Sequence, residues 1–430
     1  MKVYEQVYDY YIEKMRQGVL KSGDKMPSLR QCEKTLGVSR TSIETAYLQL
    51  AADGYIYSVE KVGYFISEIA PSLNPKDSTK ISQEPKATKQ TYEYDLATIG
   101  EDRQVSCLDL WRRYMKSALR QEDRLLDYAA SQGEEDLREE IASYVRKSRN
   151  IICSKEDVVI GAGFQNLLQI LIALIPGEKT ISFPTKDFAD GATTFKNAGF
   201  SVNYRDKESH VLYVTPSYMT KWGQIMDMKR RHEIVDHALN NNHLLIEDDY
   251  QNEFVFSSKP TPSLYALTGG ENVAFLGSFS RVLLPSVRIS YIILPKGVGQ
   301  EYQAIKKYYN QTSSKAEQIA LAQFLRDGHL NRHIKKMRKL YEEKRQLMYK
   351  ELLAAKIKDA EILFGESGME IGLRLLRDDL ELKEKIASGP VAVNMMEDKD
   401  KSLILLLSCS RIPMEQIKFA IEKLNSCLQN

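Results

Sequence analysis

Between residues 135 and 295, short apolar runs alternate with longer amphipathic segments. The apolar runs, at 157–162, 179–184, 210–216, 243–249, 273–279 and 289–295, have the length and composition of buried strands. Helix-like segments lie before or between them, at 135–149, 164–175, 189–200 and 228–241. This alternation predicts an α/β fold in which helices flank a mostly parallel sheet. In such sheets, ligands bind at the carboxyl ends of the strands.

Residues 69–92 differ in composition from the segments on either side. They are rich in Pro, Ser, Lys and Thr and contain almost no apolar side chains. Such a stretch buries too little apolar surface to offset the entropy lost on ordering, and it is typical of a linker. We therefore expect an N-terminal domain at 1–68, a linker at 69–92 and a larger domain at 93–430.

Composition restricts the class of protein. A net charge of +2 over 430 residues neither favours nor excludes nucleic acid. Five cysteines without a CxxC pair argue against a disulfide framework and fit a reducing cytoplasm. No apolar run reaches the roughly 20 residues of a membrane helix, and the six histidines are scattered. We expect a cytoplasmic protein with neither a membrane nor a metal partner.

Residues 23–67 have the pattern of a winged helix-turn-helix. A short helix ends at Gly37, and a second begins at Ser39 or Thr41, either of which can cap it. Two short strands follow, with Lys61 and Gly63 near the turn between them. Because the second helix of this fold enters the DNA major groove by its first turn, the pattern favours DNA binding over a small helical interaction domain.

These residues resemble the GntR family of bacterial regulators. The resemblance rests on PSLR at 27–30, LGVSRTSI at 36–43, AYLQLAADGYI at 46–56 and VGYFI at 62–66. It implies that operator DNA is the partner of this domain. The resemblance and the exposed first turn together indicate the following DNA-facing residues: Ser28, Arg30, Ser39, Arg40, Thr41, Thr45, Lys61 and Gly63.

The larger domain resembles fold type I aminotransferases, in the version fused to GntR heads that defines the MocR group. Motifs at 128–149, 161–171, 213–238, 246–254, 277–295 and 328–348 carry the resemblance. It implies a homodimer and a lysine that binds pyridoxal phosphate as a Schiff base. Arg281 stands at the position of that lysine. A guanidinium, with a pKa above about 12, cannot serve as an amine nucleophile, so no Schiff base and no catalytic residue are expected.

The rest of the ligand pocket is partly retained. By resemblance, Asp248 pairs with the pyridine nitrogen and Tyr250 lies near the ring oxygen. Arg288 and two serines contact the phosphate, for which arginine is a bidentate donor. The turn at 161–165 offers backbone N–H groups to an anion. The candidate ligand residues are Gly163, Phe164, Gln165, Phe188, Asp248, Tyr250, Ser278, Ser280, Arg281 and Arg288.

Other positions depart from the family pattern. Residues 218–222 differ from the family's motif, with Tyr218 in place of a histidine. The aromatic residue expected to stack on the ring is replaced by Lys186, and Phe188 follows two residues later. Arg411 lies beyond the position expected for a clamp on the substrate carboxylate. Changes at several ligand-facing positions suit a domain that no longer binds the ancestral ligand in the ancestral way.

Two roles remain open for Arg281. It could form a fixed ion pair with Asp248 or Asp249, or it could bind a phosphate or carboxylate ligand. The alternative to any ligand site is structural. In that case the two aspartates are solvated at a strand end, and Ser278 and Ser280 cap a turn.

We therefore expect a homodimeric, DNA-binding transcriptional regulator. Its aminotransferase-like domain is expected to sense an amino acid, a vitamer or a phosphate-bearing ligand without aminotransferase activity. Pyridoxal phosphate is a candidate ligand, held without a Schiff base. The alternatives are a pyridoxal phosphate-dependent aminotransferase with a DNA-binding head, and a purely structural dimerising body.

Overall fold

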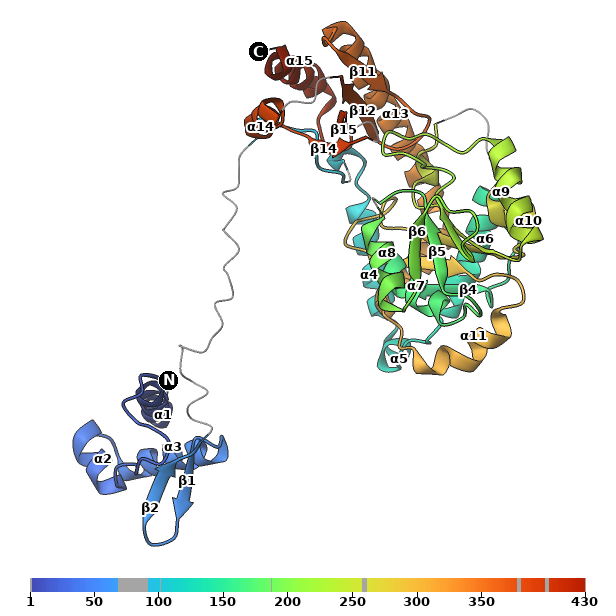
Figure 1. Cartoon of the computed structure of the whole chain (residues 1–430). Helices are drawn as coiled ribbons and strands as arrows, with labels where there is room; N and C mark the ends of the chain where they lie inside the picture. Colours follow the sequence, from blue (N-terminus) through green and yellow to red (C-terminus); the bar gives the residue numbers. More distant parts are fainter. Residues whose placement is uncertain are drawn as a thin grey trace. The chain divides into compact units, whose positions relative to one another are not determined.

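The computed structural model describes residues 2–68, 92–100, 102–186, 188–256, 261–376, 380–398 and 402–429. The chain divides into two compact units, Met1–Gln90 and Thr91–Asn430 (Figure 1). Apart from Tyr92, the segment predicted as a linker lies outside the described residues. None of the described helices is both long and apolar enough to cross a membrane.

The N-terminal unit consists of three helices and a two-stranded wing. The elements are α1 Val3–Arg16, α2 Leu29–Leu36, α3 Arg40–Ala52, β1 Ile56–Val59 and β2 Gly63–Ile66. Helix α2 ends at Gly37, whose φ of 65° lies in the left-handed region that glycine adopts without strain. The side chain of Ser39 caps α3 by accepting a hydrogen bond from the backbone N–H of Ser42. Of the two predicted caps, the structure therefore has Ser39.

The buried core of this unit holds α3 in place. Ile43, Tyr47 and Leu50 of α3 are buried against Tyr11 of α1. The hydroxyl of Tyr47 donates a hydrogen bond to the carbonyl of Pro27 at 2.9 Å, which ties α3 to the segment before α2. The burial of one face of α3 leaves the polar first turn of the helix at the surface.

The larger unit is built on a seven-stranded sheet with the order β4-β10-β9-β8-β7-β5-β6. β10 runs antiparallel to both of its neighbours, and the other neighbouring pairs are parallel. This confirms the predicted α/β class with a mostly parallel sheet. The strands are β4 Val158–Gly161, β5 Thr180–Phe183, β6 Ser201–Tyr204, β7 Val211–Val214, β8 Leu244–Asp248, β9 Val273–Ser278 and β10 Ser290–Ile293.

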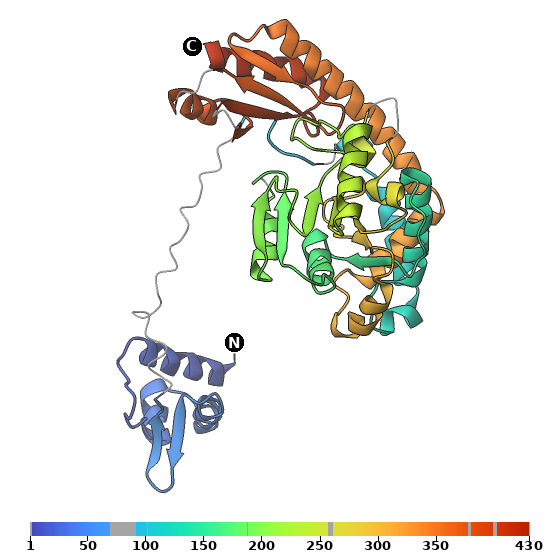
Figure 2. The same cartoon turned by 45° about the vertical axis from the view of Figure 1, so that its right-hand side comes forward.

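Helices cover both faces of this sheet (Figure 2). Alternate residues of β7 face opposite ways: Leu212 and Val214 join the larger core cluster, and Val211 and Tyr213 join the smaller. Helices α7 Phe164–Ile172, α8 Ala189–Asn197 and α11 Gly299–Ile305 contribute to the smaller cluster. The larger cluster draws on α4 Leu108–Leu119, α6 Glu135–Arg149, α9 Met228–Asn240, α10 Leu264–Thr268, α12 Lys315–Arg326 and α13 His329–Ala355.

A second sheet of four antiparallel strands, in the order β11-β12-β15-β14, lies toward the C-terminus. Its strands are β11 Ala360–Leu363, β12 Glu370–Leu375, β14 Asn394–Glu397 and β15 Leu403–Ser408. The short strands β3 Tyr94–Asp95 and β13 Val391–Ala392 pair in parallel. The remaining elements are α5 Glu122–Leu126, α14 Leu380–Ser388, α15 Ile417–Gln429 and 3-10 turns at Arg103–Val105, Asn252–Phe254, Lys306–Tyr308 and Met414–Gln416.

Candidate functional site

A cavity of about 560 Å³ opens at the carboxyl ends of β8 and β9 and the start of α7. β10 runs antiparallel to β9, so its first residue, Ser290, lies at the same edge of the sheet. The predicted ligand residues that line this cavity are Gly163, Phe164, Phe188, Asp248, Tyr250, Ser278, Ser280, Arg281 and Arg288. Gln165 does not line it. As the second residue of α7, Gln165 lies instead in a smaller depression with Gln169 and Thr194.

One end of the cavity has the chemistry of an anion cradle. Gly163 precedes the first residue of α7, has a φ of 98°, and leaves the helix N-terminus without a side-chain cap. A Cβ atom at Gly163 would lie only 2.7 Å from Nη2 of Arg288, so only glycine lets the guanidinium approach this turn. Uncapped N–H groups and a guanidinium together favour phosphate or carboxylate.

Two serines complete this end of the cavity. The hydroxyl of Ser280 donates to the carbonyl of Val287 at 3.1 Å, which holds the loop between β9 and β10 closed. The backbone N–H of Ser280 donates to Oγ of Ser278 at 3.3 Å. Ser290 is also within hydrogen-bond distance of Ser278, at 3.0 Å between their hydroxyl oxygens. These contacts fix the positions of the hydroxyls before any ligand arrives.

Asp248 also lines the cavity, and its half-buried carboxylate has a partner on a neighbouring strand. The hydroxyl of Tyr213, on the neighbouring strand β7, donates a hydrogen bond to its carboxylate. Burial raises the pKa of Asp248 to about 6, although the bond from Tyr213 acts in the opposite direction. The ring of Phe188 packs against that of Tyr213, with 5.5 Å between their centroids.

Arg281 does not form the ion pair that was one of its two expected roles. Its guanidinium carbon lies 6.0 Å from the centroid of the Tyr250 ring. Nε of Arg149 lies 2.6 Å from Oδ2 of Asp249, and Asp248 is bound by Tyr213. Among the described residues, Arg281 forms no ion pair with either aspartate, so the ion-pair interpretation is wrong. Because both carboxylates have partners within the protein, the description of them as solvated surface groups is also wrong.

The structure adds cavity residues that sequence reasoning missed. Tyr213, Lys221, Asp190 and Met369 also line it. Lys221 lies within residues 218–222, which depart from the family motif. That departure could have indicated that Lys221 lines the cavity. Tyr213 gave no such signal, because an aromatic residue in a buried strand is ordinary core.

A buried carboxylate also lies close to Arg281. Glu370 accepts a hydrogen bond from the hydroxyl of Tyr218, the residue that replaces the family's histidine. Burial raises the pKa of Glu370, and the positive charges of Arg281 and Lys221 oppose that rise. The departures at positions 218, 221 and 281 therefore meet around one acidic group.

The residues predicted to face DNA lie on the N-terminal unit. Ser28 caps α2 and Ser39 caps α3, while Arg40 and Thr41 form the first turn of α3. All the predicted DNA-facing side chains are exposed, and Gly63 is partly exposed. Lys61, with a φ of 60°, and Gly63 form the tip of the wing between β1 and β2. Among the described residues, no group of three or more His, Cys, Asp or Glu side chains could hold a metal ion.

A helix-turn-helix unit and a fold type I body with an anion cradle define the class of aminotransferase-like transcriptional regulators. The family model for bacterial regulatory proteins of the gntR family matches residues 3–66, and that for aminotransferase class I and II matches residues 100–396. The chain belongs to the MocR group of the GntR family of DNA-binding transcriptional regulators.

Individual relatives agree with this assignment. The uncharacterized HTH-type transcriptional regulator YdeL of Bacillus subtilis is 34% identical over 87% of this chain and 84% of its own length. A second B. subtilis regulator, YhdI, is 32% identical over 99% of this chain and 95% of its own. A solved kynurenine aminotransferase from Pyrococcus horikoshii, with 20% identity, covers 80% of this chain and 91% of its own with a TM-score of 0.68, and shows the fold alone.

Proposed function

We propose that residues 1–68 bind operator DNA and that residues 93–430 dimerise and sense a small anionic ligand without transferring an amino group. The observation that carries this proposal is the chemistry of Arg281 inside the cavity. A guanidinium stays charged at all physiological pH values and offers no nucleophilic lone pair. The cavity can therefore hold a ligand, but it lacks the covalent anchor on which transamination depends at this position.

The cavity fits the phosphate end of pyridoxal phosphate. Arg288, the N-terminus of α7 and the hydroxyls of Ser278 and Ser280 would hold the phosphate. Asp248 would face the ring nitrogen while its carboxylate keeps the hydrogen bond that the Tyr213 hydroxyl donates. When bound, pyridoxal phosphate supplies an aldehyde and an electron-withdrawing ring. Arg281 and Tyr250 would orient that ring by charge and stacking.

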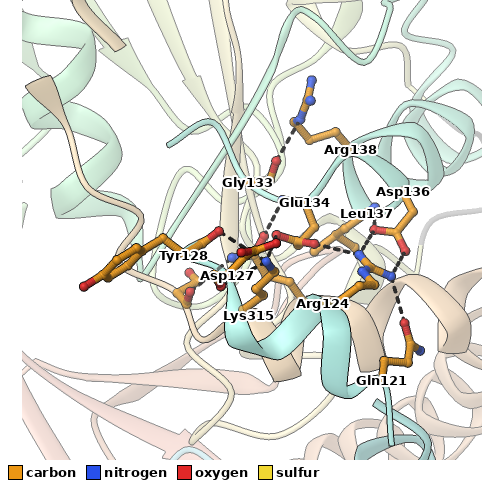
Figure 3. Close-up of polar contacts among 12 residues, drawn as sticks. Gln121, Arg124, Asp127, Tyr128, Gly133, Glu134, Asp136, Leu137, Arg138 and Lys315 are labelled. Atoms are coloured by element: carbon orange, nitrogen blue, oxygen red, sulfur yellow. Dashed lines mark hydrogen bonds and ion pairs between the residues drawn. The ribbon is translucent and has the colours of Figure 1, made fainter. Parts of the chain in front are cut away.

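Exposed apolar residues support a homodimer formed by the body. Leu126, at the end of α5, is 86% exposed, and Tyr128 is fully exposed. Their backbone is nevertheless held in place: Arg124 binds Glu134 at 2.6 Å, and Nζ of Lys315 donates to the carbonyl of Tyr128 at 3.2 Å. Figure 3 shows the Tyr128 ring pointing away from these polar contacts. A fixed backbone that presents apolar side chains to solvent suits a protein interface.

The experiment that tests this function couples the two domains. An operator selected from random DNA is titrated with the full chain, with and without pyridoxal phosphate, pyridoxamine phosphate or inorganic phosphate. We expect at least one phosphate ligand to change operator affinity, and Arg288→Gln to abolish the change. The exposed Arg146→Gln, on α6, is the matched control and should keep it. A purely structural body predicts the same affinity under all conditions.

A further inference from the structure

A second cavity, of about 630 Å³, is formed by the ends of β5 and β7, the loop after β6 and one side of α9. Tyr213 is among the lining residues of both cavities. The apolar part of the second wall includes Leu212, Val214, Met219, Met226 and Ile234.

Deep in this wall lies a hydroxyl without a partner. Thr215 is 2% exposed, and its Oγ1 atom makes no hydrogen bond to any of the described residues. An unpaired buried hydroxyl costs about 1–3 kcal/mol relative to a paired one. Such groups are rare in folded proteins, and a bound molecule with its own polar group would relieve this one.

In the described part of the chain, five charged side chains line the cavity: the cations Arg205, Lys207 and Arg230 and the carboxylates Asp206 and Glu233. The carboxylate of Asp206 accepts hydrogen bonds from the side chains of Asn203 and Ser209 and from the backbone N–H of Glu208. Glu233, the other carboxylate, is paired with Arg230 at 3.0 Å.

The cations Arg205 and Lys207 are less closely paired with acids than Arg230 is. Among the described residues, Arg205 has one side-chain hydrogen bond, from its Nε to the carbonyl of Pro184 at 3.1 Å. Its φ of 58° places this bulky residue in a left-handed conformation that is sparsely populated for non-glycine residues. Lys207 forms an exposed ion pair with Glu208, with 3.8 Å between Nζ and Oε1. Two cations at the mouth of an apolar cavity favour an anionic ligand group.

We propose that this second cavity binds an amphipathic carboxylate: an apolar, preferably aromatic body against the two methionines, a carboxylate at Arg205 and Lys207, and a polar group that reaches Thr215. Methionine side chains adapt to ligand shape and make favourable contacts with aromatic rings. The site is separate from the anion cradle and goes beyond the function proposed above. Because Tyr213 also bonds Asp248, an occupant would press on a residue that both cavities share.

Three related probes test this site in the full chain without DNA. The first is 3-(4-hydroxyphenyl)propionate, the second is its amide, and the third is 3-phenylpropionate. Binding is followed by the methyl resonances of Met219 and Met226, with buried Met348 of α13 as the internal control. We expect the first probe to shift Met219 and Met226, to leave Met348 unchanged, and to bind at least about five-fold tighter than its amide.

Two substitutions separate the polar contacts. Thr215→Val should weaken the hydroxylated probe by about five-fold and leave 3-phenylpropionate unchanged. Lys207→Gln should weaken both carboxylates and leave the amide unchanged, whereas the exposed Lys229→Gln, in the first turn of α9, should alter none of them. The proposal is overturned if carboxylate and amide bind equally, if Lys207→Gln and Lys229→Gln behave alike, or if Met219 and Met226 do not respond. Arg288→Gln should not affect these probes, so failure here is distinguishable from failure of the anion cradle.

Discussion

The guanidinium of Arg281 lies over the ring of Tyr250, with 6.0 Å between the guanidinium carbon and the ring centroid. Both residues line the cavity in which the family resemblance calls for a nucleophilic lysine. The arrangement keeps a permanent positive charge beside an aromatic ring and a cradle for anions. Under the proposed function, this cavity would bind a ligand without an amine at position 281.

Arg281→Lys should restore an amine to the cavity. The variant, mixed with pyridoxal phosphate, should develop a visible absorbance band and retain a borohydride-stable adduct at position 281, because a buried lysine can present a neutral amine. The wild-type chain should not. Peptide mass mapping locates any adduct, and Arg281→Gln serves as the control without charge or amine. An adduct at Lys221 in the wild-type chain would contradict our view that the ligand is held non-covalently.

Arg40→Ala should weaken operator binding. Arg40 is the first residue of α3 and is exposed, so its loss should cost about 1–3 kcal/mol of binding free energy if it contacts a base. Fluorescence anisotropy at several salt concentrations measures both affinity and salt dependence. Arg16→Ala, at the end of α1, is the matched control. Equal effects of the two substitutions would show that α3 does not enter the groove.

Arg231 should matter for folding rather than for ligand binding. It is fully buried and donates to the carbonyls of Met226, Pro262 and Pro216 at 2.9, 2.9 and 3.2 Å. Removing these charged donors with Arg231→Met should lower the free energy of unfolding by about 3 kcal/mol or more.

Its neighbour Arg230 provides the control. Arg230 is exposed and, among the described residues, its side chain pairs with Glu233 alone, so Arg230→Met should change stability by less than about 1 kcal/mol. Urea unfolding of both variants measures the difference. Similar losses for the two would show that the buried guanidinium does not hold the loop after β7.

Stability should depend on the ionisation of Glu253. Burial raises the pKa of Glu253 to about 7 from an ordinary value of 4.5, with a smaller contribution in the same direction from Asp249. The unfolded chain loses this proton near pH 4.5 and the folded chain only near pH 7. The folded state therefore binds more protons in that window, and the free energy of unfolding falls as pH rises from about 4.5 to 7.

Glu253→Gln should remove this part of the pH dependence. The amide oxygen can still accept the hydrogen bond that Tyr144 donates to Glu253 at 2.7 Å. The difference in free energy of unfolding, variant minus wild type, should therefore be more positive at pH 8 than at pH 5. Glu139→Gln, an exposed position on α6, is expected to leave the slope unchanged. A Glu253→Gln variant with the wild-type slope would exclude a buried titration at this position.

Local sequence patterns predicted six of the seven strands of the central sheet. Apolar runs such as those containing Ile246 and Leu276 predicted strands, and polar residues at the ends of those runs predicted the edge where Asp248 and Ser278 meet. The edge strand β6 was missed because its sequence, Ser-Val-Asn-Tyr, is short and largely polar. The four-stranded C-terminal sheet was missed because β12 pairs with a strand that begins about 30 residues later, a non-local contact without a local pattern.

The geometry of the site depended on contacts that a sequence does not contain. The partner of Asp248 is Tyr213, thirty-five positions away on a neighbouring strand. The partner of Asp249 is Arg149, whose position on α6 gave no indication of it. Gln165 follows Phe164 directly, yet the first turn of α7 directs the two side chains to different depressions.

The most direct test of the central claim is amino transfer by the purified full chain. The chain is supplied with pyridoxal phosphate, ¹⁵N-labelled amino acids and a mixture of 2-oxo acids, and the label is followed by mass spectrometry. Our account predicts transfer no faster than with free pyridoxal phosphate. Transfer above that rate, lost on Asp248→Ala, would show that the body is an enzyme.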